Sequence, residues 1–206
     1  MNSALKVVVG IVAAIVAFMV VDIGFQKYRE HAATHELDEK LAQLKADAAR
    51  NNPNVPTSEA IKQEAIADAG RLLKDAPDEE KRRQTAASTF FGFYLVNMRS
   101  RAEYCQDQGV DIQPFTDLFA RNHANVLAAA RPILATTGYD EDKMYAMLKS
   151  QLRQMTEIDM KDIATGSKTD AKGACQLIVT NAEVVADKLQ LAKVQPAVYR
   201  ALMPGG

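Results

Sequence analysis

The sequence predicts an all-α protein: a single amino-terminal transmembrane helix, a helical linker region, and an up-down four-helix bundle followed by a short carboxy-terminal helix. Three observations predict this fold class. The run Val7–Val21 is continuously apolar, as in a membrane span. The rest of the chain is rich in helix-forming residues such as alanine, leucine and glutamate. Long alternating runs of Val, Ile and Thr, which would indicate strands, are missing after the apolar run.

We divide the chain into three parts on this basis. Residues 1–27 form the transmembrane anchor, residues 28–77 a helical stalk and linker region, and residues 78–206 an extracytoplasmic helical bundle. The 206 residues include 25 basic and 26 acidic side chains, which gives a net charge of −1. Because the two signs are mixed along the chain, nothing attracts a nucleic acid, and we expect no nucleic-acid partner.

The flanks of the apolar run extend it to a length that can cross a bilayer. Residues 4–25 make roughly 22 residues, or about 33 Å of helix, against the roughly 20 residues that a span requires. A cleaved secretory signal is the alternative, but the residues that follow, DIGFQ at 22–26, lack the small-x-small pattern of a cleavage site. We therefore predict a retained signal-anchor that contacts the membrane through residues 4–25.

The cysteines indicate on which side of the membrane the bulk of the chain lies. Positive charges stand on both sides of the anchor, at Lys6 and at Lys27 and Arg29, so they do not orient it. The chain has two cysteines, Cys105 and Cys175, which suits one structural disulfide in an oxidising compartment. We predict a single-pass protein of the cell envelope with an extracytoplasmic carboxy-terminal domain, periplasmic if the source is bacterial.

A narrow apolar stripe follows the anchor. Leu37, Leu41 and Leu44 are spaced four and three residues apart in a charged helical segment. The stripe fits the seam of a short coiled-coil stalk, and with the small residues Gly10 and Ala14 of the anchor it would make a homodimer. It fits equally well a single amphipathic helix that lies on its own domain or on the bilayer. The sequence leaves both alternatives open.

The helical pattern breaks at residues 51–57, where two prolines and three asparagines form a linker. A second helix starts at Thr57 or Ser58, either of which can cap it, and ends at about Ala76. The bundle begins at Asp78, a second potential cap. The linker and this helix therefore separate the stripe of leucines from the compact part of the chain.

Apolar periodicity predicts the helices of the bundle, which cover residues 78–105, 114–138, 140–165 and 170–191, with a short one at 196–203. Residues 90–96 are apolar nearly all round, which is typical of a helix surrounded by others. Pro132 predicts a kink or an early end of the second helix. Reversals at Gly109, Gly138 and Gly166 join helices of similar length, which favours the up-down arrangement.

This topology brings the two cysteines together. Cys105 ends the first helix of the bundle, and Cys175 lies in the first turns of the fourth, so three reversals return the chain to the same end. We predict a disulfide between them, with a Cα separation in the range of about 4.4–6.8 Å that the bond allows. A redox-active pair is the alternative, but the spacing is not C-x-x-C.

Candidate catalytic and metal-binding residues are few. His31 and His35 share a helix face and are the candidate metal ligands, although a structural zinc site takes four. His123 has no nucleophile tied to it, and the carboxylates between residues 141 and 162 alternate with Lys and Arg, as on a solvated helix. Motifs for phosphate binding, serine hydrolysis or zinc proteolysis are absent from the sequence. We predict no metal, no cofactor and no enzymatic activity.

By elimination, the sequence favours an interaction, accessory or assembly factor that binds a protein partner it does not identify. The first rival is a sensor bundle for a small ligand or lipid, in which the bulky aromatic side chains line a cavity rather than fill the core. These side chains are Phe90, Phe91, Phe93 and Phe115. The second rival is an enzyme with a cleft around His123.

Overall fold

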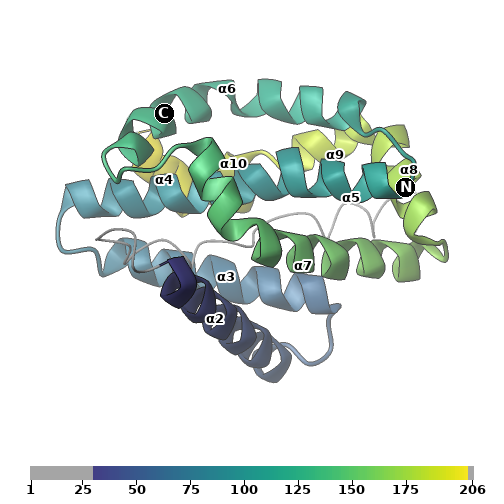
Figure 1. Cartoon of the computed structure of the whole chain (residues 1–206), viewed down its shortest axis with the longest axis horizontal. Helices are drawn as coiled ribbons and strands as arrows, with labels where there is room; N and C mark the ends of the chain where they lie inside the picture. Colours follow the sequence, from purple (N-terminus) through teal and green to yellow (C-terminus); the bar gives the residue numbers. More distant parts are fainter. Residues whose placement is uncertain (1–29, 204–206) are drawn as a thin grey trace.

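The computed structural model describes residues 30–203, with side chains from residue 37 onward. Described residues form helices and turns, and none of them forms a strand, so the all-α prediction is confirmed for this part of the chain (Figure 1). The helices are α2 (Glu30–Asn51), α3 (Thr57–Lys74), α4 (Glu79–Leu95), the π-helix η1 (Val96–Ser100), α5 (Arg101–Asp107), α6 (Gln113–Ala135), α7 (Glu141–Ser167), α8 (Ala171–Thr180), α9 (Ala182–Lys188), α10 (Leu191–Val194) and α11 (Pro196–Leu202).

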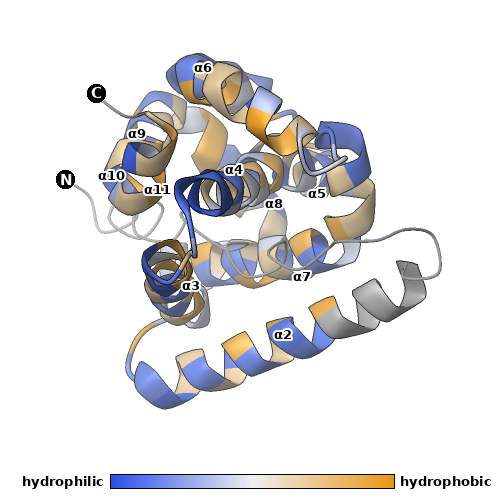
Figure 2. Ribbon diagram, turned by 90° about the vertical axis from the view of Figure 1, so that its left-hand side faces the viewer, coloured by the Kyte–Doolittle hydropathy of each residue, from blue (hydrophilic) through white to orange (hydrophobic). Residues whose placement is uncertain are grey.

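Helix α4 is the centre of the molecule. It begins at Asp78, whose carboxylate accepts the backbone N–H of Lys81 at 2.7 Å, as expected of an N-cap. From residue 85 to residue 97 every side chain is buried. The other helices surround α4, with α6 on one side of it and α7 on the opposite side (Figure 2). The prediction of a helix enclosed by others is thus confirmed.

The arrangement around α4 differs from a simple four-helix bundle. The chain does run up and down through the continuous rod α4–η1–α5 and then through α6 and α7 (Figure 1). However, α6 and α7, which are consecutive in the sequence, are separated by α4 (Figure 2). Helices α3 and α11 also pack on α4. Because α4 is buried on every side from residue 85 onward, two bundle neighbours do not cover it, and the additional helices supply the missing surface.

Two of the three predicted reversals use glycine as expected. Gly109 and Gly138 have φ angles of +71° and +84°, a region that side chains with a Cβ rarely adopt. The third reversal is not at Gly166, which lies inside α7. It is at Lys168, with a φ of 53°. Pro132 is tolerated inside α6, which ends three residues later at Ala135.

The predicted helix over residues 170–191 is two helices rather than one. Asn181 leaves the helical conformation, at φ −116° and ψ 26°, and its side-chain N–H donates to the carbonyl oxygen of Leu177 at 2.8 Å. The chain changes direction there, so that α8 packs on α7 and α9 packs on α6. Asparagine bonds readily to its own backbone, which favours a helix end over a continuous helix. The short last helix is present as predicted, at Pro196–Leu202.

Cys105 at the end of α5 and Cys175 in α8 form a disulfide, with their Cα atoms 5.6 Å apart and 70 residues between them in the sequence. Both side chains are fully buried. The predicted proximity of the two cysteines is therefore confirmed. It holds even though the fourth helix is broken, because the break at Asn181 comes after Cys175.

The leucine stripe of α2 faces the inside of a single chain. Leu37, Leu41 and Leu44 are 3%, 2% and 5% exposed, and they belong to the same hydrophobic core as the rest of the described helices. Two polar bonds fix α2 on α7: the amide of Gln151 donates to Asp38 at 2.8 Å, and Lys45 donates to the side-chain oxygen of Gln154 at 3.0 Å.

The structure therefore favours the helix folded onto its own domain over the coiled-coil stalk. An amphipathic stripe needs an apolar partner, and α3 and α7 of the same chain already provide it. The proposed division at residue 78 separates two parts of one core. Of the predicted surfaces for self-association, the pair Gly10 and Ala14 remains, and it lies outside the described residues.

A cysteine at position 41 distinguishes the two arrangements experimentally. We expect the full chain carrying Leu41→Cys to form no crosslink between two copies in membranes, and its thiol to react with a maleimide only after unfolding, because the side chain at this position is 2% exposed. Ala42→Cys, on the exposed face of the same helix, should react in the native protein and serves as the control. An efficient disulfide-linked dimer through position 41 would restore the stalk.

The predicted membrane anchor, residues 1–27, lies outside the described residues. Within residues 30–203, no helix has both the length and the apolar character that a membrane crossing needs.

Candidate functional site

The rod formed by α4 and α5 contains one turn of π-helix at its middle. At this turn, η1, the side-chain N–H of Asn97 donates to the carbonyl oxygen of Phe93 at 2.8 Å. Such π-turns insert one residue into a helix and often mark functional positions. Here the turn changes the helical register, and its last residue, Ser100, and the next residue, Arg101, are polar and each 2% exposed.

These two residues meet α7 inside the protein. The hydroxyls of Ser100 and Thr156 are 2.8 Å apart, and Nη2 of Arg101 lies 2.6 Å from Oδ2 of Asp159. Nη1 of Arg101 also donates to the sulfur of Met160 at 3.2 Å. We call Ser100, Arg101, Thr156 and Asp159 the buried polar cluster. It joins η1 and α5 to α7 by specific bonds rather than by apolar packing alone.

The pKa of the Asp159 carboxyl is higher than usual for an aspartate. Burial raises its pKa to about 6, although the Arg101 guanidinium beside it acts in the opposite direction. One turn further along α7, Asp162 accepts the backbone N–H of Ser58 at 2.8 Å and thereby fixes the start of α3. A perturbed carboxyl is typical of catalytic sites, but this one is 3% exposed as a residue. The cluster therefore connects η1 and α5 to α7 and is buried from solvent, while Asp162 beside it holds the start of α3.

The sequence contains a pattern that indicates this buried cluster, although we did not predict it. Asp159 continues the spacing of the apolar stripe of α7, four residues after Met155 and four before Ile163. Likewise Arg101 lies four residues before Cys105 and four after Asn97. A charged residue at a core position of a helix predicts a buried partner of opposite charge. The identity of that partner depends on how the helices pack.

His123 of α6 is enclosed by aromatic rings. Its ring centroid is 4.1 Å from that of Phe119, and the rings of Phe90 and Phe93 lie at 6.2 and 5.5 Å. Nδ1 lies 2.8 Å from the carbonyl oxygen of Phe119, so it carries the proton, and Nε2 accepts the backbone N–H of Leu191 at 3.2 Å. Both nitrogens of the neutral ring are thus used, and the ring is 1% exposed. His123 links α6 to the start of α10.

The environment of His123 predicts a pH dependence of stability. Burial lowers its pKa below the usual 6.5, against the smaller opposing effect of the carbonyls of Phe119 and Leu189. Below about pH 6.5 the unfolded chain therefore binds a proton that the folded chain does not, which lowers the free energy of unfolding. We expect the stability of the wild type relative to His123→Gln to fall between pH 7.5 and pH 5, by at most about 1.4 kcal/mol per pH unit.

Urea unfolding of both proteins over this pH range measures the effect. The comparison with the variant is necessary because Asp159 has the opposite influence. Its folded-state pKa is raised, so the folded chain binds a proton first as the pH falls through about 6, and stability increases. This contribution is common to both proteins and cancels in the difference. A difference that is independent of pH would contradict a neutral, buried His123.

The other carboxylates of α7 and its start are engaged in surface interactions. Asp142 pairs with Arg99 at 2.6 Å, and Glu157 pairs with Arg153 at 2.9 Å. Glu141 pairs with Arg131 at 3.1 Å. Together with Asp159 and Asp162, each carboxylate singled out in the sequence has a partner on a helix surface or inside the core. These carboxylates are paired at separate places on the protein, as expected of a solvated or structural role.

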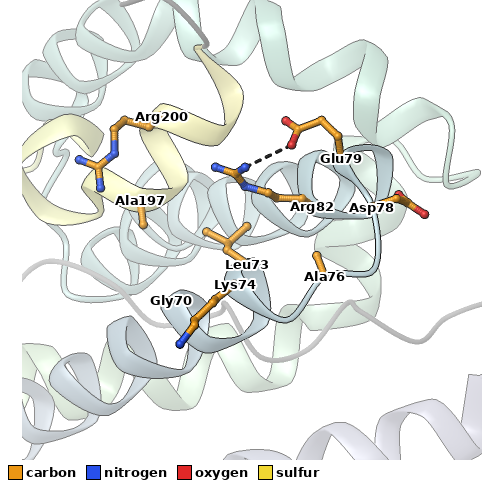
Figure 3. A pocket seen from close by; sticks show the side chains of 9 residues that line it. All are labelled: Gly70, Leu73, Lys74, Ala76, Asp78, Glu79, Arg82, Ala197 and Arg200. Carbon is orange, nitrogen blue, oxygen red and sulfur yellow. Dashed lines mark hydrogen bonds and ion pairs between the residues drawn. The ribbon is translucent and has the colours of Figure 1, made fainter.

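An open pocket lies at one end of the molecule. It has a volume of about 400 Å³ and is formed where the end of α3, the start of α4 and helix α11 meet (Figure 3). Apolar side chains contribute to it alongside three cations and two carboxylates. Its lining residues are Gly70, Leu73, Lys74, Ala76, Asp78, Glu79, Arg82, Ala197 and Arg200. Because the stretch 70–82 and helix α11 are far apart in the sequence, the sequence alone does not predict that they meet in a pocket.

The candidate metal ligands His31 and His35 fall in α2, in the stretch whose side chains lie outside the described part. Among the side chains that are described, no three His, Cys, Asp or Glu residues are close enough to hold a metal ion together. The pocket at α3, α4 and α11 is open to solvent and carries charged side chains, so it is a candidate binding site.

No protein-family model, curated protein or solved structure matches this chain. The fold and the candidate sites define its class as an all-α, disulfide-bonded protein with a closed aromatic core and a charged pocket on its surface.

Proposed function

We propose that this protein is a membrane-tethered interaction or accessory factor, whose helical domain lies outside the cytoplasm and binds a protein partner through its surface. The observation that carries the proposal is the closure of the core around His123. This residue was the candidate centre of an enzyme, and both of its nitrogens are bonded to backbone while aromatic rings surround it.

The aromatic core also bears on the ligand-binding alternative. Phe90, Phe91, Phe93 and Phe115 are each fully buried, and they contact one another or Phe119 with ring centroids 5.4–5.7 Å apart. This packing supports a filled aromatic core over a ligand cavity lined by the same side chains. The polar and charged side chains that a partner could contact therefore lie on the outer surface of the described domain, which supports the recognition of a macromolecule.

The tether and the compartment rest on two independent features. The apolar run Val7–Val21, extended by its flanks, has the length of a membrane span and no cleavage pattern. The bond between Cys105 and Cys175 is of the kind that persists in oxidising compartments. Together they support a single-pass anchor with the domain outside the cytoplasm.

Crosslinking in intact membranes tests the proposal. The full chain, with a purification tag at its carboxy terminus, is treated with a membrane-impermeant amine crosslinker before the membranes are dissolved. We expect a covalent product of one defined mass that contains a second protein, and we expect the uncrosslinked chain to resist alkaline carbonate extraction. The same membranes, solubilised in denaturing detergent before crosslinking, provide the control and should yield no such product.

The outcomes separate the alternatives. A chain that never crosslinks to another protein contradicts an interaction role. Co-purification of a stoichiometric lipid or small molecule, detected by native mass spectrometry, would support the sensor bundle instead. Release by carbonate, or a mature chain that begins near residue 25, would remove the anchor. A chain that is crosslinked only by permeant reagents would place the domain in the cytoplasm.

A further inference from the structure

The charges around the pocket at α3, α4 and α11 are unequally neutralised. Oε2 of Glu79 is 3.2 Å from Nη1 of Arg82, and the carboxylate of Asp78 accepts the backbone N–H of Lys81. Both acidic side chains are thus engaged with groups of their own helix. Within the part of the chain that the structure describes, Lys74 and Arg200 have no ion-pair partner. The pocket keeps two uncompensated positive charges on different helices.

We propose that this pocket binds the carboxylates of an acidic peptide segment of a partner protein. The proposal rests on the proposed interaction role and names the surface and the chemistry of its partner. Lys74 at the end of α3 and Arg200 on α11 supply the two free cations, and Arg82 is a third that the partner can share with Glu79. Charge-assisted hydrogen bonds from arginine and lysine are the strong contacts for carboxylates.

The lining of the pocket favours a peptide over a small inorganic anion. Leu73 and Ala197 lie between the cations and provide apolar surface for the aliphatic part of a side chain (Figure 3). Asp78 and Glu79 lie on the α4 side of the pocket and repel any anion there, so the carboxylates of a bound peptide would lie on the side of Lys74 and Arg200 (Figure 3). A volume of about 400 Å³ is large for a lone anion and suits several side-chain groups.

The helices that form the pocket are packed on the core of the protein, whereas the two unpaired cations are exposed to solvent. Leu73, Val198 and Leu202 are 6%, 1% and 2% exposed, and helix α11 packs on both α3 and α4. Lys74 and Arg200 are exposed. In Figure 3 they extend along the outside of their helices. Because no ion pair holds them, they can turn toward a carboxylate without first breaking another ion pair.

Binding of a defined peptide to the purified full chain in neutral detergent tests the proposal. The probe is a fluorescent tetraglutamate peptide, acetylated and amidated so that its side chains carry all of its charge. The tetraglutamine peptide is the neutral control. By fluorescence anisotropy we expect the tetraglutamate to bind and the tetraglutamine not to bind. The double variant Lys74→Gln/Arg200→Gln should weaken binding by about tenfold or more, since it removes two charged contacts.

A matched variant separates the pocket from general attraction. Lys81→Gln/Arg83→Gln removes the same two charges from exposed positions of α4 that do not line the pocket. This control variant should change the affinity for tetraglutamate by less than about threefold, because charges outside the pocket act on the peptide only through electrostatic attraction that salt screens. Equal losses in the two double variants, or no binding to the wild type, would overturn the proposal. Displacement of the peptide by an equimolar amount of inorganic phosphate would assign the pocket to phosphate instead.

The same variants distinguish this inference from the proposed function. If crosslinking in membranes captures a partner equally well with Lys74→Gln/Arg200→Gln, the interaction role stands and the pocket is not its surface. If the pocket binds tetraglutamate but no partner is captured from membranes, the binding chemistry stands and the interaction role fails.

Discussion

Arg101→Met is expected to lower the free energy of unfolding by about 3–5 kcal/mol, the usual effect of removing one partner of a buried ion pair. Methionine preserves most of the length of the side chain and removes its charge. Asp159, 3% exposed and 2.6 Å from the guanidinium, then loses the main positive charge that offsets its burial and keeps only the weaker effect of Lys62. Urea unfolding at pH 8, where the carboxyl is ionised, measures the loss most directly.

Two controls identify the mechanism. The double variant Arg101→Met/Asp159→Leu should recover most of the loss, because an apolar pair of similar volume often replaces a buried ion pair without cost. The single variant should also become more stable as the pH is lowered toward 5, since protonation removes the unpaired charge of Asp159. A single variant as stable as the wild type, or a double variant no better than the single one, would contradict the assigned role of the ion pair.

Cys175→Ser is expected to lower the free energy of unfolding by about 2–5 kcal/mol, as the loss of a native disulfide commonly does. The bond links residues 70 apart, and for a loop of this length the chain-entropy model gives a contribution on the order of 4 kcal/mol. The serine hydroxyl would in addition occupy a fully buried position. Urea unfolding of variant and wild type, monitored by circular dichroism, gives the difference.

Reductant provides the control for this variant. It should destabilise the wild type by a similar amount and leave Cys175→Ser unchanged, because the effect belongs to the bond and not to the sulfur atom. Thiol labelling of the protein taken directly from cells tests the compartment in the same experiment. Two thiols that react only after unfolding, without any reductant, would mean a reduced chain in the cell and would remove the main support for an extracytoplasmic domain.

Much of the fold could be predicted because its signals are local. Asp78, Asp140 and Asp170 each accept a backbone N–H three residues on, so the starts of α4, α7 and α8 follow from the cap residue. The positive φ angles of Gly109 and Gly138 likewise require glycine. The helix break at Asn181 was not predicted, because the apolar pattern of residues 170–191 continues through it. The break lets α8 pack on α7 and α9 pack on α6, and the sequence does not specify these packing partners.

The position of α2 could not be decided from the sequence. Leu37, Leu41 and Leu44 specify an apolar stripe but not the surface that covers it, and a second copy of the chain would satisfy the same pattern. The candidate sites also differ in how far the sequence predicts them. Arg101 and Asp159 occupy core positions of their helices, so the sequence could have predicted that they are buried but not that they pair with each other. The pocket depends on the packing of α11 against the stretch 70–82, a contact between distant parts of the sequence that no local pattern predicts.

The place of the disulfide in the chain has a consequence for biosynthesis. Cys105 is translated before α6 and α7, and Cys175 follows them 70 residues later. At about 5–20 residues per second, the first cysteine waits roughly 4–14 seconds for its partner. The sequence has two cysteines, so no wrong pairing within the chain is possible during this interval. The bond can close only after the residues of both intervening helices have been synthesised, so it cannot stabilise any shorter nascent chain.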